Sequence, residues 1–263
     1  MKNFITKVNL KQIGIQTGVV LFWLLLWQGI SMIVQQEIVL VSPVQVFQRL
    51  FSLAGTEDFW YVTSLSLCRI FFGFLVGMLI GIVLAVLTTH FSILHQLFSP
   101  VLSIMRATPV TSFIILAFFL LAKADIPGFV SVLMVTPIVW KNVTEGILQT
   151  DGQLLEMAKV MKIGRVATIT KIYMPSVKPY LNAACVTAIG LAWKAGVAAE
   201  VITNPTYGIG AKMYQAKVDL EMADLFAWTI VVIVLSVLCE KCFSYFMKRR
   251  GRLANINQRD KGI

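Results

Sequence analysis

The chain has 263 residues, of which 57% are hydrophobic and only 14% charged. This composition is too apolar for a soluble globular domain and indicates a membrane protein. The formal net charge of +10 does not indicate nucleic-acid binding, because that would need a basic face with interleaved aromatic residues on a soluble element, and no such segment is present.

Apolar stretches long enough to cross a bilayer recur along the chain. A hydrocarbon core of ~30 Å requires ~20 mostly apolar residues in a helix. The third stretch is short, and Pro137 interrupts the fourth. We therefore expect an all-α, polytopic membrane protein with one domain over residues 1–263 and about six transmembrane helices, at residues 15–34, 64–88, 109–122, 126–147, 179–202 and 224–247.

Basic residues indicate the orientation of these spans. The first apolar run is too long for a signal peptide, so it is expected to be retained as a span. By the positive-inside rule, the clusters before it, after the fourth span and at the C-terminus place both termini in the cytosol of a cell-membrane protein. These residues are Lys2, Lys7, Lys11, Lys159, Lys162, Arg165, Lys171, Lys178, Lys248, Arg249, Arg250, Arg252, Arg259 and Lys261, against Arg49, Lys123, Lys212 and Lys217 on the opposite side.

A short helix is expected after the first span. Ser42 can cap it and Pro43 suits its first turn, and the next apolar residues follow the helical period. The charge pattern places this helix on the outer surface.

Small residues form a stripe on the second span. Gly73, Gly77, Gly81 and Ala85 recur at every fourth position, which lets another helix backbone approach closely. The pattern does not say whether that helix belongs to the same subunit or to another. The fifth span is also rich in alanine, so we expect both helices in a tightly packed centre.

The loop between the fourth and fifth spans is charged. Asp151 and Gly152 precede a predicted helix over residues 153–162, whose apolar positions follow the helical period. Pro175 and Pro179 are expected to end this segment before the fifth span begins.

Two charged residues lie inside the fifth span. A charge at mid-bilayer costs ~2.5–3.5 kcal/mol, so Lys194 and Glu200 are expected to face protein or water, either in a solute pathway or in structural pairing. Six positions of a helix turn through about 240° net, so the two do not share a face and are not expected to pair with each other.

The cysteines and histidines do not form a metal or redox site. Cys239 and Cys242 form a C-x-x-C without a second ligand pair, and His90 and His95 are poorly spaced for a common ion. We expect no metal and no cofactor.

The charged loop resembles the cytoplasmic loop of binding-protein-dependent ABC transporter permeases, which reads Glu-Ala-Ala, then Gly, then Ile-x-Leu-Pro. Glu156 and Pro175 stand at the spacing of that pattern, with Ala158 and Ile172 in register. Met157 and Lys162 depart from it; Lys162 occupies the usual glycine position, and Gly164 is expected to take over the glycine's role.

Further segments are similar to the nitrate, sulfonate and taurine group of these permeases. They are Arg106-Ala107-Thr108-Pro109, Trp193-Lys194-Ala195, Ala199-Glu200 and Gly208-Ile209-Gly210, and the resemblance covers about residues 60–245. It implies a permease that dimerises, receives solute from an extracytoplasmic binding protein and is driven by two ATP-binding subunits. It also implies that the loop at about residues 148–178 docks on the ATPase through a helix that turns Glu156 and Ala158 toward it.

Two other functional classes are less well supported. The chain lacks a phosphate-binding G-x-x-x-x-G-K-[ST] loop, so ATP hydrolysis is expected in a partner and not here. An ion-coupled secondary transporter would usually show repeated halves with matching broken helices, and an intramembrane enzyme would gather its ionisable groups at one depth. Neither pattern is present, so the favoured function is the permease subunit of an ATP-driven importer for a small organic or anionic solute.

Overall fold

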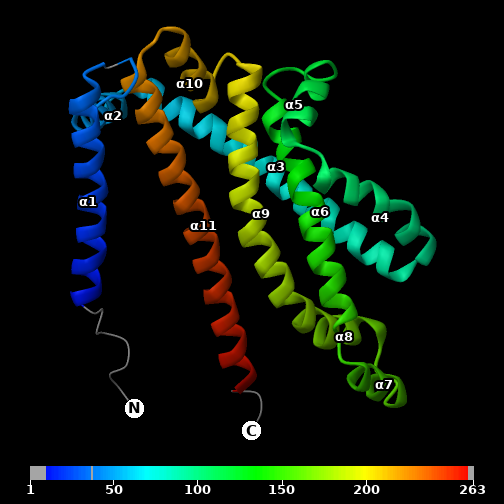
Figure 1. The fold of residues 1–263 in the computed structure, drawn as a ribbon. Helices are drawn as coiled ribbons and strands as arrows, with labels where there is room; N and C mark the ends of the chain where they lie inside the picture. Colours follow the sequence, from blue (N-terminus) through cyan, green and yellow to red (C-terminus); the bar gives the residue numbers. More distant parts are fainter. Residues whose placement is uncertain (1–9, 37, 260–263) are drawn as a thin grey trace. The chain divides into compact units, whose positions relative to one another are not determined.

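The structure is a computed structural model that describes residues 10–36 and 38–259. Over these residues it contains helices and no strand (Figure 1). The helices are α1 (Leu10–Val34), α2 (Pro43–Ala54), α3 (Glu57–His90), α4 (Ser92–Ala107), α5 (Val110–Phe118), α6 (Ile126–Leu148), α7 (Gly152–Val160), α8 (Arg165–Thr168), the π-helix η1 (Ile169–Tyr173), α9 (Met174–Thr203), α10 (Ile209–Val218) and α11 (Met222–Arg259).

Five segments in the described part of the chain are long and apolar enough to cross a membrane. They are Thr17–Val34, Glu57–His90, Ile126–Leu148, Arg165–Thr203 and Met222–Tyr245. The expected third span has a different form, because α4 and α5 meet at an angle of 100° and would count together as a sixth, broken span. The all-helical, polytopic fold is confirmed, with five or up to six candidate spans.

Pro109 explains the break between α4 and α5. A proline restricts the residue before it to extended backbone, and Thr108 has φ −75° and ψ 134°. The helix therefore stops at Ala107 and restarts at Val110 in a new direction. The predicted bounds of the third span, residues 109–122, are wrong for this reason, because α5 ends at Phe118 and continues back into α4 only through the bend.

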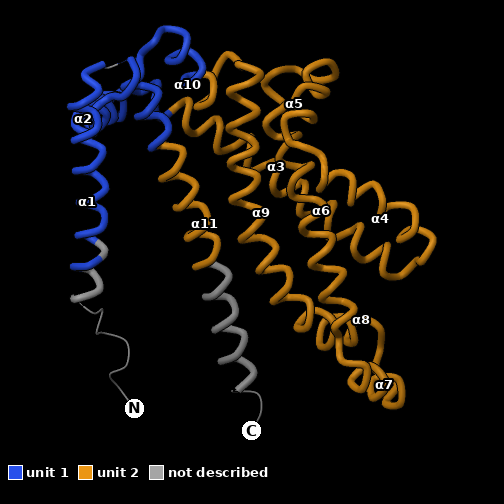
Figure 2. The backbone as a smooth tube through the Cα atoms, viewed as in Figure 1, with its two compact units in different colours: residues 1–60, 212–230 blue, residues 61–211, 231–263 orange. Residues whose placement is uncertain are grey.

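The contacts of the chain divide it into two compact units, residues 1–60 with 212–230 and residues 61–211 with 231–263 (Figure 2). The expectation of a single domain stays a prediction.

In the first unit, α2 begins with the predicted cap. Ser42 and Gln45 form a capping box, and Pro43 lies in the first turn. Arg49 of α2 binds both carboxylate oxygens of Asp224, and the Lys212 ammonium lies 2.7 Å from the Asp58 carboxylate. A small core of Val41, Val46 and Ala227 completes this unit. Two of the four basic residues expected on the outer side are thus ion-paired.

In the second unit, the glycine stripe of α3 packs directly against α6. A Cβ atom added at Gly77 would lie 2.9 Å from the Val132 carbonyl oxygen, and one at Gly81 would lie 2.8 Å from the Thr136 oxygen. A Cβ at Gly73 would overlap the Gly128 carbonyl group. The two backbones therefore touch without side chains between them, and the stripe serves a contact within one subunit.

Helix α9 packs along α6 and is largely buried in this unit. Its alanines fill the contact, as expected from the sequence. Ala195 and Ala199 join a core with residues of α5 and α6, namely Ile114, Ala117, Ile126, Val130 and Met134. The core of the second unit is therefore formed by the packing of α3, α5, α6 and α9.

Candidate functional site

The loop that joins α6 to α9 folds into three short helical elements. Asp151 caps α7, and its side chain accepts a hydrogen bond of 2.9 Å from the Gln153 amide. After α7, residues Arg165–Thr203 continue through α8, η1 and α9 as one candidate span of 39 residues. The expectation that Pro175 and Pro179 separate the loop from the span is wrong. Pro175 lies in the first turn of α9, where a missing N–H is tolerated, and Pro179 is accommodated inside the helix.

The end of α7 has the geometry of a Schellman motif. The Ile163 amide donates to the Ala158 carbonyl at 2.9 Å, and the Lys162 amide donates to the Lys159 carbonyl at 3.1 Å. Lys162 itself has φ 50°, in the left-handed region that glycine occupies at low cost. Gly164 has φ −63° and ψ 150°, which any residue adopts. The expectation that Gly164 replaces the missing glycine is therefore wrong, because Lys162 adopts the strained conformation at the original position.

Replacing Lys162 with glycine should relieve this strain. We expect the Lys162→Gly variant to hold the end of α7 more stably by about 1 kcal/mol, which is the usual cost of a non-glycine residue in this conformation. Hydrogen exchange of the Ile163 amide should slow accordingly. A Gly164→Ala variant is the control and should leave this exchange unchanged, because its backbone is ordinary and no atom lies within 4 Å of the added Cβ. Equal exchange in Lys162→Gly and the native chain would contradict the assignment of strain.

The two residues expected to face a partner lie on opposite sides of α7. Two positions of a helix turn through about 200°. Ala158 is 3% exposed, whereas Glu156 is exposed. The expectation that α7 turns both side chains outward is therefore wrong: Ala158 supports the loop from within, and only Glu156 is available at the surface. Of the other pattern residues, Ile172 is buried, and Gly164 and Pro175 are exposed.

The outer surface of the loop is apolar as well as basic. Val160 is 82% exposed and Val166 is 76% exposed. Side chains of this kind normally lie against another surface, and a contiguous patch of them marks an interaction site. The exposed apolar residues of the loop are Leu154, Met157, Val160, Met161, Ile163, Val166 and Ile169, and we call them the loop patch.

At the opposite end of α9, Glu200 is completely buried, and both of its carboxylate oxygens have hydrogen-bond partners. The Ser66 hydroxyl lies 2.8 Å from both carboxylate oxygens, and the Gly210 amide donates to Oε2 at 3.0 Å. A guanidinium nitrogen of Arg69 lies 3.8 Å from Oε1. Because a buried carboxylate is costly unless it is hydrogen-bonded and paired, these groups explain why the membrane-spanning helix tolerates Glu200. Glu200 is thus hydrogen-bonded inside the protein, and its role, in the pathway or in structural pairing, stays a prediction.

Lys194 has the opposite environment. Its side chain is exposed on the surface of α9, and it makes no hydrogen bond or ion pair with any residue that the structure describes. Helix geometry predicted that Lys194 and Glu200 do not pair with each other, and this prediction is confirmed. An exposed ammonium group inside a span is costly in lipid, which favours a watery pathway or another subunit next to Lys194.

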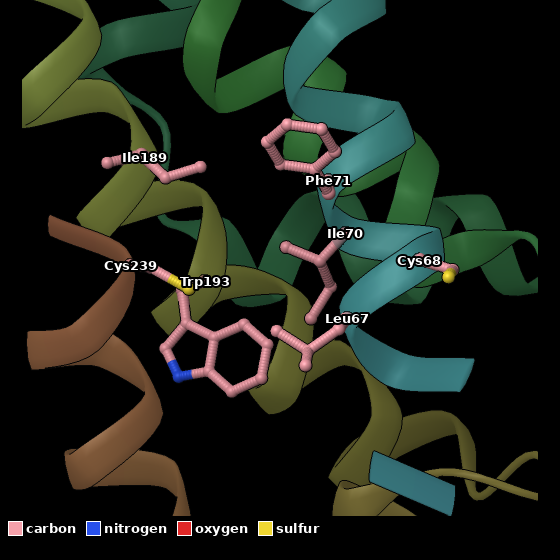
Figure 3. A pocket seen from close by; sticks show the side chains of 7 residues that line it. All are labelled: Leu67, Cys68, Ile70, Phe71, Ile189, Trp193 and Cys239. Atoms are coloured by element: carbon pink, nitrogen blue, oxygen red, sulfur yellow. The ribbon is translucent and has the colours of Figure 1, made fainter. Parts of the chain in front are cut away.

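A cavity of about 200 Å³ lies between α3, α9 and α11 (Figure 3). Leu67 and Ile70 face Trp193 across it, and the Trp193 indole N–H donates to the Val232 carbonyl at 3.0 Å. The complete lining is apolar side chains and two thiols: Leu67, Cys68, Ile70, Phe71, Ile189, Trp193 and Cys239. It offers no charged group to a polar solute.

Most of the chain matches one known protein family. Residues 77–249 match the family described as binding-protein-dependent transport system inner membrane component. The chain belongs to this family. It is the membrane-spanning permease subunit of an ABC importer, as the resemblance implied.

Several relatives of this permease are named for their solutes. The nitrate import permease protein NrtB of Leptolyngbya laminosa is 28% identical over 77% of this chain and 75% of its own length. The bicarbonate transport system permease protein CmpB of a Synechocystis strain is 26% identical, over 72% and 68%. The prediction that the chain is a permease of the nitrate, sulfonate and taurine group is therefore confirmed.

Solved structures support the same fold. The permease matches the methionine ABC transporter MetNI in an inward-facing form, with a TM-score of 0.58, 15% identity, and coverage of 72% of this chain and 93% of that one. It also matches an amino acid ABC transporter, with a TM-score of 0.58, 16% identity, and coverage of 78% and 94%. Among the described residues, no group of histidine, cysteine and acidic residues could hold a metal ion.

Sequence reasoning missed two partners of Glu200 in the permease. Arg69 is a charged residue inside the second expected span, and the argument applied to Lys194 and Glu200 applies to it as well. Ser66 carries no such signal, because a serine in a span usually bonds its own helix. Its contact with Glu200 joins residues 134 positions apart, which only the fold reveals.

Proposed function

We propose that two copies of this permease form the translocation pathway for a small anionic solute, with two ATP-binding subunits on the loop patch. An extracytoplasmic binding protein delivers the solute at the other end of α9. The observation that carries the proposal is the loop patch itself, since it exposes large apolar side chains on a charged segment that is otherwise suited to water.

The orientation of the proposed assembly follows from charge. The loop of α7 and α8 carries Lys159, Lys162 and Arg165, and the positive-inside rule favours the cytosol for it. By the same rule, the basic clusters at the N-terminus and the C-terminus also face the cytosol. The residues before Leu10 and after Arg259 lie outside the described part of the chain. Both termini and the loop patch then face the ATP-binding subunits.

The solute class rests on Lys194 and on the relatives. Nitrate and bicarbonate are the solutes in the names of the two relatives, and both are small anions. Lys194 is an exposed cation with no counter-charge among the described residues, on a helix that is otherwise largely buried. A pathway that admits anions gains from such a charge, because the ammonium group offsets part of the cost of dehydrating the solute.

The proposal is tested by isolating the complex. The tagged permease, co-expressed with an ATP-binding subunit and reconstituted in lipid, should show two copies of each by native mass spectrometry and should hydrolyse ATP. An ion-coupled secondary transporter would instead be purified without an ATPase and would accumulate solute under an imposed ion gradient. That result would overturn the proposal.

Replacing Lys194 with methionine tests its proposed role. The Lys194→Met variant should insert normally, because the substitution removes the charge from the membrane, and uptake should fall about ten-fold through the loss of one charge contact. The measurement is solute uptake per unit of permease in the membrane. Lys194→Arg keeps the charge and should retain most of the uptake. Uptake unchanged in Lys194→Met at a normal protein level would contradict a pathway role.

A further inference from the structure

Ser66 and Glu200 connect three elements at one point. The carboxylate belongs to α9, the Ser66 hydroxyl to α3, and the Gly210 amide to the start of α10. The Ile209 amide donates to the Ser66 oxygen at 2.9 Å, so Ser66 accepts from the segment after α9 and donates its single proton to Glu200. We call the group of Ser66, Arg69, Glu200 and the amides of Ile209 and Gly210 the latch.

The latch also fixes the segment between α9 and α10. Arg69 donates to the Tyr207 carbonyl at 2.7 Å, and the Tyr207 ring packs edge-on against Tyr61. A Cβ atom at Gly208 would lie 2.8 Å from the Glu200 carboxyl carbon, and one at Gly210 would lie 2.8 Å from the backbone carbon of Glu200. The close approach of the segment to the backbone of α9 therefore requires a glycine at residue 210, and the glycine at residue 208 leaves room for the Glu200 carboxylate.

The helical segment that carries Glu200 includes two members of the loop patch, Val166 and Ile169. The other five lie before Arg165, on α7 or in the turn after it. Residues Arg165–Thr203 make 39 residues of continuous helical structure, or about 58 Å at 1.5 Å per residue. Val166 and Ile169 of the loop patch lie at its beginning, and the latch lies near its end. A displacement of one end therefore reaches the other through a single packed element, provided that the latch holds the segment at residues 204–210 to it.

We propose that Glu200 is a positioning residue that holds the segment at residues 204–210 onto α9 and so transmits docking of the solute-binding protein to the ATP-binding subunits. This inference rests on the proposed function. The exposed surface of the segment consists of Asn204, Thr206 and Tyr207, which offer polar and aromatic contacts to a protein partner. Loss of the latch separates the segment from α9, so binding no longer accelerates ATP hydrolysis.

The experiment uses the complete complex of the permease and its ATP-binding subunits in lipid nanodiscs. The probe is the solute-binding protein as isolated, and the readout is the ratio of the ATPase rates with and without it. In Ser66→Ala, a hydrogen bond to a charged group is lost, which should reduce this ratio about five-fold or more. The rate without binding protein should stay within about two-fold, since the ATP site lies in the partner subunits.

A matched control lies one turn away on α3. Thr63 is buried, and its hydroxyl has no hydrogen-bond partner in the part of the chain that the structure describes. Thr63→Val removes a buried hydroxyl from the same helix and should leave the ratio unchanged. Glu200→Gln is the second test variant; combined with Ser66→Ala it should reduce the ratio little further, because both substitutions disable one latch.

Hydrogen exchange separates the possible outcomes. The amides of Ile209 and Gly210 should exchange faster in Ser66→Ala than in the native permease or in Thr63→Val. Faster exchange with an unchanged ATPase ratio would show that the latch is only structural, and would overturn the inference. A native complex that does not hydrolyse ATP, or does not respond to the binding protein, would overturn the proposed function instead.

Discussion

Val160→Asp should abolish ATP-driven uptake while the permease still reaches the membrane in normal amount. Val160 is the most exposed member of the loop patch, at 82%. Placing a carboxylate in an apolar contact requires its desolvation without a partner, and an interface residue that carries the contact contributes about 2 kcal/mol or more. The measurements are uptake and the amount of ATP-binding subunit that is purified with the permease.

The control for Val160→Asp keeps the apolar character. Val160→Met presents a similar surface and should retain uptake and association. Folding of the loop should survive both substitutions, because the side chain makes few contacts within the permease. If Val160→Asp retains uptake, the loop patch is not the contact with the ATP-binding subunits.

Gly73→Ala should prevent accumulation of folded permease. Its added methyl group would overlap the Gly128 carbonyl, which is backbone and cannot rotate away. Helices α3 and α6 would have to separate along their contact, which we expect to cost about 3 kcal/mol or more. The measurement is the yield of monodisperse permease after extraction from the membrane and its apparent melting temperature.

Gly29→Ala is the matched control for Gly73→Ala. Gly29 also lies within an apolar helix, but no atom lies within 4 Å of a Cβ added there. Alanine is the better helix former by about 1 kcal/mol, so yield and melting temperature should be equal or slightly higher. Equal behaviour of the two variants would contradict direct backbone contact at Gly73.

Hydropathy and helical period predicted most of the fold. Five of the six expected spans correspond to helices of sufficient length, because some twenty apolar residues have few alternatives in a bilayer. The third expected span failed at Pro109, where local backbone chemistry overrode the apolar pattern. The glycine stripe correctly indicated a close helix contact, but only the structure identified α6 as its partner.

The candidate site was less predictable than the fold. The angular separation of Lys194 and Glu200 follows from helix geometry alone, and their environments do differ. The partner of Glu200 depends on tertiary packing, since Ser66 comes from a distant helix. At Lys162, the family pattern gave the position of the left-handed residue, but the presence of a lysine there misdirected the interpretation to Gly164.

The contact of α3 with α6 has a further property that follows from its repeat. Glycines spaced four apart present nearly the same surface at each repeat, so they do not distinguish one register of the two helices from another displaced by four residues, or about 6 Å. A hydrogen bond outside the repeat makes the distinction. The Trp140 indole N–H donates to the Thr88 hydroxyl at 2.9 Å. The glycines thus determine how closely the helices approach, while the hydrogen bond from Trp140 to Thr88 determines where along their length they meet.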